Sequence, residues 1–241
     1  MHMRKKKWAR PELAACPFYV NGGEEEKGKW KQRFAHPERP LHMEMGCGKG
    51  VSTSKMIADN PEVNYIISDM SPDVLGTARR NIEEACGKEP DNVMILRTDI
   101  CFIQRVFGPE DKAERIYIHF CNPWTEHLRH EKRRLTHPRQ LMQYREFLQE
   151  GGEIWFKTDD DTLFEESLVY FDLCGFEPVT VGWDLHADGF TPNYISEHEQ
   201  KYMAQGVPIK YGVFRMKPET PDFDPTRYHL RQGKQNSNLR E

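Results

Sequence analysis

The stretch Glu44-Met45-Gly46-Cys47-Gly48-Lys49-Gly50 decides how this chain is expected to fold. It follows a predicted strand at residues 41–45 and precedes a segment, 49–59, that is expected to be helical. Glycines between a strand and a helix allow a sharp turn and a close approach of the backbone to a ligand. The stretch therefore predicts a strand, a ligand-binding loop and a helix of an open α/β sheet.

Short apolar runs and longer amphipathic segments continue to alternate along the chain. This alternation is typical of a mostly parallel sheet with helices on both faces. The predicted fold is α/β and doubly wound, a Rossmann-like sheet whose last strand is antiparallel. Strands are expected at residues 41–45, 64–69, 93–97, 115–121, 153–158, 179–183 and 209–216, and helices at 49–59, 72–85, 138–149 and 162–174.

The two ends of the chain differ in composition from this middle part. Residues 1–34 mix basic, acidic and glycine clusters, which predicts a basic, flexible arm that is extended or ordered only on binding. Residues 218–241 are polar and contain several prolines, which predicts a tail that adds little to a core. The α/β domain is therefore expected to span residues 35–217.

Composition narrows the class of protein. The chain has 241 residues, 37% of them hydrophobic and 30% charged, which is enough for one α/β domain with appendages. No apolar run is long enough to span a membrane, and Met1–Trp8 lacks the apolar stretch of a signal peptide, so a cytoplasmic protein is expected. The six cysteines form no close pairs, so neither a disulfide framework nor a metal site is expected.

Carboxylates at the ends of predicted strands indicate the ligand. Asp69 lies about twenty residues beyond the loop, where a carboxylate can accept hydrogen bonds from ribose hydroxyls. Glu44 precedes the loop, where it would repel a pyrophosphate and attract a cationic sulfonium amino acid. Asp99 could accept from an adenine amino group. Together with Gly46 and Gly48, these residues favour S-adenosylmethionine over two alternatives, a dinucleotide and a plain glycine turn with solvated acids.

Positive charge is concentrated in two segments, although the net charge is −4. One is Arg4–Arg10. The other, Arg129–Arg139, contains five Lys and Arg residues against one Glu and follows the turn Phe120–Trp124 at the end of the fourth predicted strand. A charge run is often a solvated face, but basic side chains beside a strand end of this kind can bind nucleic-acid phosphates.

Four motifs, in this order, resemble those of the bacterial tRNA (guanine-N7-)-methyltransferase family, and together they cover roughly residues 35–216. Two of them are more diagnostic than the glycine loop: Arg-His-x-Lys-Arg-Arg-Leu at residues 129–135, called the basic motif below, and residues 196–202, called the late motif. The motifs are the Glu-x-Gly-x-Gly-x-Gly loop, the Phe-x-x-Pro-Trp turn followed by Arg-His-x-Lys-Arg-Arg-Leu, the strand end Lys157-Thr158-Asp159, and Ser196-Glu197-His198-Glu199-Gln200-Lys201-Tyr202.

The resemblance implies methyl transfer from S-adenosylmethionine to N7 of a guanosine in tRNA. It implies that Glu44, Asp69, Asp99 and Asn122 line the cofactor site, with the loop glycines Gly46 and Gly48. The residues expected to face the guanosine are Glu126, Asp159, Ser196, Glu197, His198 and Glu199, and those expected to bind tRNA phosphates are Arg129, Lys132, Arg133 and Arg134.

Three positions depart from the family pattern. Asn122 stands where the family usually has Asp, Glu126 where it commonly has Lys, and Ser196 where it usually has Thr. Guanine N7 has an in-plane lone pair and no proton, so its methylation needs no base and can rest on proximity and alignment. Asn122 is therefore expected to position the cofactor and the guanine.

The guanine base offers N1–H and N2–H₂ as neighbouring donors, from which Asp159 or Glu199 could accept. Two other functions stay open, a methyltransferase for a substrate other than RNA and a catalytically inactive tRNA-binding relative. The sequence leaves the choice between a monomer and a homodimer open.

Overall fold

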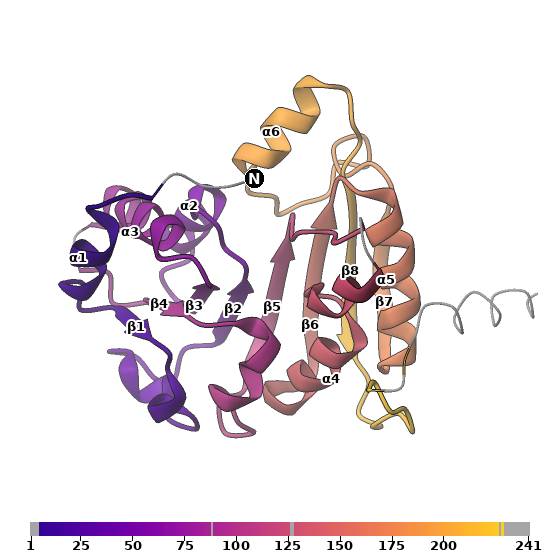
Figure 1. Ribbon diagram of the computed structural model, residues 1–241, viewed down its shortest axis with the longest axis horizontal. Helices are drawn as coiled ribbons and strands as arrows, with labels where there is room; N and C mark the ends of the chain where they lie inside the picture. The colour runs from indigo at the N-terminus through magenta and orange to yellow at the C-terminus, as the bar shows by residue number, and fades with distance from the viewer. Residues whose placement is uncertain (1–4, 88, 126–127, 227, 229–241) are drawn as a thin grey trace, which may run out of the picture.

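The computed structural model describes residues 5–87, 89–125, 128–226 and 228. Its strands form one eight-stranded sheet in the order β1-β4-β3-β2-β5-β6-β8-β7 (Figure 1). All pairings are parallel except those of β8, which is antiparallel to both β6 and β7. The predicted α/β fold with an antiparallel last strand is confirmed. The strands are β1 (Tyr19–Asn21), β2 (Leu41–Met45), β3 (Asn64–Asp69), β4 (Val93–Arg97), β5 (Ala113–His119), β6 (Leu148–Thr158), β7 (Phe176–Gly182) and β8 (Lys210–Met216).

Helices connect these strands and cover the sheet. From β2 the chain runs through α2 to β3, and from β5 it runs the opposite way through α4 to β6. Because such crossovers are right-handed, α2 and α3 lie on one face and α4 and α5 on the other. The helices are α1 (Ala9–Ala14), α2 (Val51–Asp59), α3 (Pro72–Cys86), α4 (Pro138–Phe147), α5 (Asp161–Leu173) and α6 (Glu197–Ala204), with short 3-10 helices η1 (Glu24–Glu26), η2 (Trp30–Arg33), η3 (Ile100–Arg105) and η4 (Leu128–Arg133).

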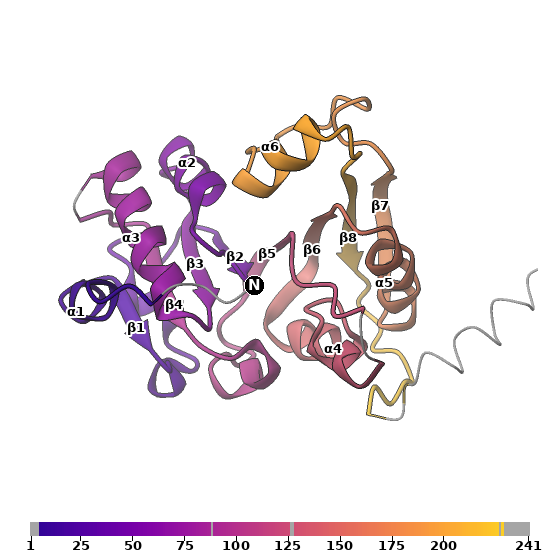
Figure 2. The same cartoon turned by 45° about the horizontal axis from the view of Figure 1, so that its top comes forward.

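The direction of winding reverses between β2 and β5, which are neighbours in the sheet. Ligands of open α/β proteins bind at the carboxyl ends of the strands beside such a reversal. The loop after β2 and the turn after β5 both lie at this edge. The α6 helix extends over the same edge from the β7–β8 side toward α2 (Figures 1 and 2).

The described part of the N-terminal segment differs from the flexible arm that the sequence predicted. Residues 19–21 pair in parallel with β4 and extend the sheet. Trp30 is fully buried, and its Nε1 donates to the Val106 carbonyl at 2.9 Å. Leu13 and Phe18 are also buried in the main core. Trp30 stands between two lysines, and Leu13 and Phe18 lie in a short apolar stretch, 13–20, between the basic and acidic clusters, so the overall composition of the segment concealed them.

The predicted tail also contributes a little to the core in its described part. Phe223 and Tyr228 pack against the main core, and the rings of Tyr228 and Tyr170 lie 5.6 Å apart between centroids. Residues 227 and 229–241 lie outside the described part. Within the residues described, no helix is long and apolar enough to cross a membrane, and no group of three or more His, Cys, Asp and Glu side chains could hold a metal ion.

Candidate active site

The glycine loop after β2 is held open at the switch point. The backbone N–H of Gly46 donates to the Ser68 carbonyl on β3 at 2.8 Å, which fixes the start of the loop. Gly46 and Gly48 have φ of +82° and +56°, in the left-handed region that favours glycine. A Cβ on Gly46 would lie 3.1 Å from Leu135 Cδ1, whereas a Cβ on Gly48 would meet no atom of the described residues within 4 Å apart from its chain neighbours. Gly48 therefore borders open space at the surface of the loop.

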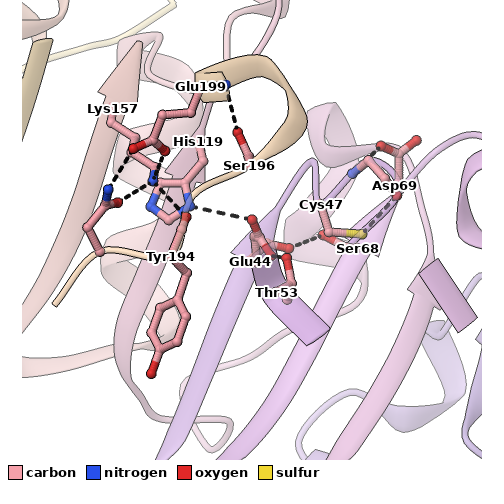
Figure 3. Close-up of polar contacts among 12 residues, drawn as sticks. Glu44, Cys47, Thr53, Ser68, Asp69, His119, Lys157, Tyr194, Ser196 and Glu199 are labelled. Atoms are coloured by element: carbon pink, nitrogen blue, oxygen red, sulfur yellow. Dashed lines mark hydrogen bonds and ion pairs between the residues drawn. The ribbon is translucent and has the colours of Figure 1, made fainter. Parts of the chain in front are cut away.

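Two carboxylates lie at the ends of the neighbouring strands. Asp69 Oδ2 accepts from the Gly48 N–H at 3.3 Å (Figure 3), and Oδ1 accepts from the Ser71 N–H at 2.8 Å. Burial raises the pKa of Asp69, and these hydrogen bonds oppose the increase. Asp99 is half-buried and caps η3, where it accepts from the Cys101 N–H at 3.0 Å. Both side chains are thus oriented by backbone amides.

Two exposed apolar side chains stand beside these acids and were missed by the sequence analysis. Met70 follows Asp69 and is 62% exposed, and Phe102 in η3 is 46% exposed. Large exposed apolar side chains beside oriented polar groups are typical of a binding site. The available signal was an apolar residue within three positions of each strand-end acid, which is too common to be noticed alone.

Glu44 lies behind the loop and is almost fully buried. Its Oε2 accepts a hydrogen bond from the Thr53 hydroxyl on α2, and its Oε1 lies 3.6 Å from Nδ1 of His119 on β5 (Figure 3). Burial, and next the charge of Lys157, lowers the pKa of His119. Glu44 therefore places a negative charge behind the loop, beside a neutral imidazole. Glu44, His119 and Lys157 line a cavity between α2, β5, β6 and residues 185–194.

The late motif is anchored to the sheet by a buried ion pair. Lys157 Nζ on β6 lies 2.7 Å from Glu199 Oε2 on α6, and both side chains are buried. Glu199 Oε1 accepts from Asn193 Nδ2 at 2.6 Å. Burial lowers the pKa of Lys157, and the charge of Glu199 opposes that decrease. Both oxygens of Glu199 are thus engaged by the protein itself.

The other residues of the late motif lie at the mouth of the site. The Ser196 hydroxyl accepts from the Glu199 N–H at 3.1 Å and caps α6. Glu197 Oε2 lies 2.8 Å from Nζ of Lys49, the residue that follows Gly48 in the glycine loop. The exposed His198 ring stacks on Phe120 at 6.1 Å between centroids and 17° between planes. The late motif therefore meets both the glycine loop and the turn after β5.

The structure distinguishes the three consecutive aspartates after β6. Asp160 caps α5 and accepts from the Leu163 N–H at 2.7 Å. Asp161 pairs with Lys210 on β8. Asp159 is half-buried and hydrogen-bonded to Tyr202 of α6, and this contact is the largest cause of the raised pKa of Tyr202. Asp159 is thus the aspartate that faces the late motif.

The turn after β5 carries Asn122 on the surface. Asn122 Oδ1 accepts from the Trp124 N–H at 3.0 Å. Phe120 and Trp124 have φ of +50° and +48°, a left-handed backbone conformation that is unfavourable for residues other than glycine. Such strain persists only where the surroundings fix the backbone, and it gathers at functional sites. The turn is therefore a strained and locally fixed platform for the Asn122 amide.

Proteins with similar sequences identify the family. A tRNA (guanine-N(7)-)-methyltransferase of Clostridium perfringens is 51% identical over 214 residues, covering 88% of this chain and 97% of that protein. Another from Acetivibrio thermocellus is 44% identical over 220 residues, covering 90% and 100%. The family model described as "Putative methyltransferase" matches residues 38–211. The chain belongs to the bacterial tRNA (guanine-N7-)-methyltransferase family.

The solved structures agree with this family at the level of the fold. The crystal structure of the 16S rRNA methyltransferase KamB has a TM-score of 0.55 and 11% identity, covering 90% of this chain and 96% of that one. An antibiotic-resistance methyltransferase, Kmr, has a TM-score of 0.50 and 15% identity, covering 75% and 88%. At these identities the likeness shows the Rossmann-like methyltransferase fold alone.

The basic motif of this family member divides into exposed and buried cations. Lys132 and Arg133 are exposed, and the Arg133 guanidinium lies 5.2 Å from the Trp124 ring centroid. Arg134 is only 1% exposed, and its Nε donates to the Pro123 carbonyl at 2.6 Å. This placement corrects the expectation that Arg134 binds phosphate, because its guanidinium has no access to solvent. Glu126 and the side chain of Arg129 lie outside the described part of the chain.

Proposed function

We propose that this chain transfers the methyl group of S-adenosylmethionine to N7 of a guanosine in tRNA. The observation that carries the proposal is the convergence of the family's motifs at one edge of the sheet. The glycine loop, the Asn122 turn, Asp159 and the late motif come from distant parts of the sequence. They are joined at this edge by the Lys49–Glu197, Phe120–His198 and Asp159–Tyr202 contacts.

The residues at the ends of β2, β3 and β4 fit S-adenosylmethionine. The loop leaves open space at Gly48, and the oriented Asp69 carboxylate suits the ribose hydroxyls. We assign the adenine amino group to Asp99 and the faces of the adenine ring to the exposed Met70 and Phe102. The buried Glu44 favours a cationic ligand through its charge. When bound, the cofactor supplies an electrophilic methyl group.

Asn122 is suited to orient the acceptor base and not to remove a proton. Its Oδ1 is engaged by the Trp124 N–H, and its amide NH₂, on an exposed side chain, can donate to an acceptor such as guanine O6. Guanine N7 needs no deprotonation, so the protein has to hold it in line with the methyl group. Proximity and alignment of this kind can lower a barrier by about 7–11 kcal/mol.

Asp159 is our choice as the acceptor for N1–H and N2–H₂ of guanine. Its carboxylate lies beside α6 and is half-exposed, whereas both Glu199 oxygens already accept from Lys157 and Asn193. We assign Glu199 to holding α6 in place. Ser196, Glu197 and His198 remain proposed to face the guanosine at the mouth of the site.

The exposed Lys132 and Arg133 are the proposed phosphate contacts, together with Arg129. The Arg133 guanidinium lies beside Trp124 of the Asn122 turn, so a phosphate bound there would bring the flanking nucleotide to the site. A base that is to be methylated has to leave its stack, which RNA loops allow at low cost. A tRNA substrate would place the reaction in the cytoplasm.

The deciding experiment is transfer of a labelled methyl group from S-adenosylmethionine to unmodified bulk tRNA, followed by nucleoside analysis. We expect labelled 7-methylguanosine. If cofactor and tRNA both bind and no label is transferred, the protein is an inactive tRNA-binding relative. If transfer needs a different substrate and tRNA binding shows no salt dependence, the RNA proposal fails.

A further inference from the structure

We infer that Arg134 is a positioning residue that fixes the Asn122 turn relative to the glycine loop, which is the proposed cofactor loop. Its guanidinium is inside the protein, and Nε donates to the carbonyl oxygen of Pro123 at 2.6 Å. Pro123 lies between Asn122 and the strained Trp124. The contact therefore holds the turn from beneath, at the residue next to the amide that faces the site.

The other side of the guanidinium is fixed to a rigid helix. Nη1 donates to Glu166 Oε2 and to the Tyr170 hydroxyl, the latter at 3.2 Å. Glu166 and Tyr170 are four residues apart on α5 and so lie on the same face of that helix. A buried charge is tolerated only when it is paired and hydrogen-bonded, and Arg134 meets both conditions. It thus bridges α5 and the turn.

The residues after Arg134 complete the connection. The Thr136 hydroxyl lies 2.7 Å from that of Ser167 on α5, and both residues are fully buried. Leu135 Cδ1 would lie 3.1 Å from a Cβ on Gly46, so Leu135 is packed against the cofactor loop. Residues 134–136 therefore contact α5, the Asn122 turn and the glycine loop. One short segment sets the position of Asn122 with respect to the cofactor loop.

Lysine cannot replace this residue in the bridging role. The guanidinium is a planar fork with donors on different sides, so it reaches Pro123 and Glu166 together. A lysine ammonium at position 134 keeps the charge for Glu166 but cannot span both partners. Arg134→Lys should therefore release the turn without leaving an unpaired carboxylate in the interior.

The kinetic test rests on the proposed function and uses single-turnover methyl transfer at saturating cofactor and tRNA. The rate constant reports alignment, while the amplitude reports the active fraction. We expect Arg134→Lys to lower the rate constant about 100-fold, as a misplacement of about 1 Å can do. The dissociation constant for tRNA and its salt dependence should not change. Arg133→Ala should instead weaken tRNA binding and reduce the slope of log K against log salt by about one.

Arg145 supplies a matched control for an arginine that only supports the fold. Its guanidinium donates to the carbonyls of Cys174, Gly175, Lys217 and Glu219 at 2.8–3.2 Å, around the end of α5. Arg145→Lys should lower thermal stability and the amplitude while leaving the rate constant unchanged. An equal fall of the rate constant in Arg145→Lys and Arg134→Lys would overturn the inference, because both would then act through stability alone.

A second measurement is independent of catalysis. In protein labelled with fluorotryptophan, the ¹⁹F resonance of Trp124, assigned with Trp124→Phe, should shift in Arg134→Lys and not in Arg145→Lys. It would do so even if the protein transferred no methyl group, so failure of the proposed function is distinguishable. An unmoved Trp124 resonance, an unchanged rate constant, or tRNA binding weakened as in Arg133→Ala would each show that Arg134 does not hold the turn.

Discussion

Lys157 on β6 and Glu199 on α6 form an ion pair of 2.7 Å in the interior, forty-two positions apart in the sequence. Asn193 contacts both partners, since its Oδ1 accepts from Lys157 at 2.7 Å and its Nδ2 donates to Glu199 at 2.6 Å. The pair ties the late motif to the strand that ends in Asp159. The position of α6 over the carboxyl edge therefore depends on a contact that solvent does not reach.

Removing one partner of this pair should destabilise the protein. Lys157→Met leaves the Glu199 carboxylate buried without its cation, which we expect to cost about 3–5 kcal/mol of unfolding free energy. The double variant Lys157→Met/Glu199→Leu buries no charge and should recover most of that loss. Urea denaturation measures both. A double variant no more stable than Lys157→Met would contradict this account.

Stability should fall with acid because imidazoles are buried in neutral form. Burial, with the charge of Arg115, lowers the pKa of His42 to about 3. In the unfolded chain this imidazole takes up a proton near pH 6.5. Between about pH 6.5 and pH 3 the unfolded chain therefore binds a proton at this imidazole that the folded protein does not bind. The unfolding free energy is unaffected by His42 ionisation above about pH 6.5 and decreases by about 1.4 kcal/mol per pH unit as pH falls toward 3. The variant His42→Gln should flatten the dependence of unfolding free energy on pH in this window.

Tyr65→Phe is the control for that experiment. Tyr65 packs edge-on against His42 at 5.7 Å between ring centroids, so its change perturbs the same part of the core. It removes no imidazole, and the slope of stability against pH should match that of the unaltered protein. Equal slopes for His42→Gln and the unaltered protein would exclude His42 as a source of acid sensitivity.

Gly48→Ala should weaken cofactor binding more than it weakens the fold. Gly48 has φ of +56°, and among the described residues only its chain neighbours have atoms within 4 Å of the position that a Cβ would take. The backbone change costs about 1 kcal/mol, and the new methyl group enters the open space of the loop. Gly189, with φ of +64° and equally free surroundings, provides the same backbone cost elsewhere. Calorimetry should show about tenfold weaker cofactor binding for Gly48→Ala, a loss of about 1.4 kcal/mol, and unchanged cofactor binding for Gly189→Ala.

Asp159 and Asp160 should separate recognition from stability. Asp159→Asn presents a donor to the donors of guanine, and kcat/KM for tRNA should fall about 10- to 100-fold, the equivalent of one charged hydrogen bond. Asp160→Ala removes the cap of α5 and should lower unfolding free energy by about 1 kcal/mol. The reverse pattern, with kcat/KM reduced only in Asp160→Ala, would move recognition to the neighbouring aspartate.

A negative charge at position 122 should be unnecessary for transfer. In Asn122→Asp a carboxylate oxygen can still accept from the Trp124 N–H, so we expect the turn and most of the single-turnover rate to persist. Asn122→Ala removes that acceptor and should lower the rate about 100-fold. A large gain of rate in Asn122→Asp would show that charge at this position limits the reaction.

The sequence by itself was enough for seven of the eight strands, the loop and the family, but not for β1, which lies in the segment predicted to be a flexible arm. Strands, helices and glycine turns follow from the local spacing of apolar residues and from backbone preferences, so the predicted boundaries lie near the observed ones. Where they differ, the cause is pairing, since β6 already begins at Leu148 beside Ala113 of β5. The motifs were recognisable because their residues stand together in the chain.

Only the tertiary structure decided what individual charged residues do. Arg133 and Arg134 are neighbours in one basic motif, yet one is exposed and the other is buried against α5. The sequence predicted Glu199 as a possible acceptor for guanine, whereas in the structure its carboxylate is paired with Lys157. The burial of a charge depends on partners far away in the chain, and the type and spacing of neighbouring residues do not identify those partners.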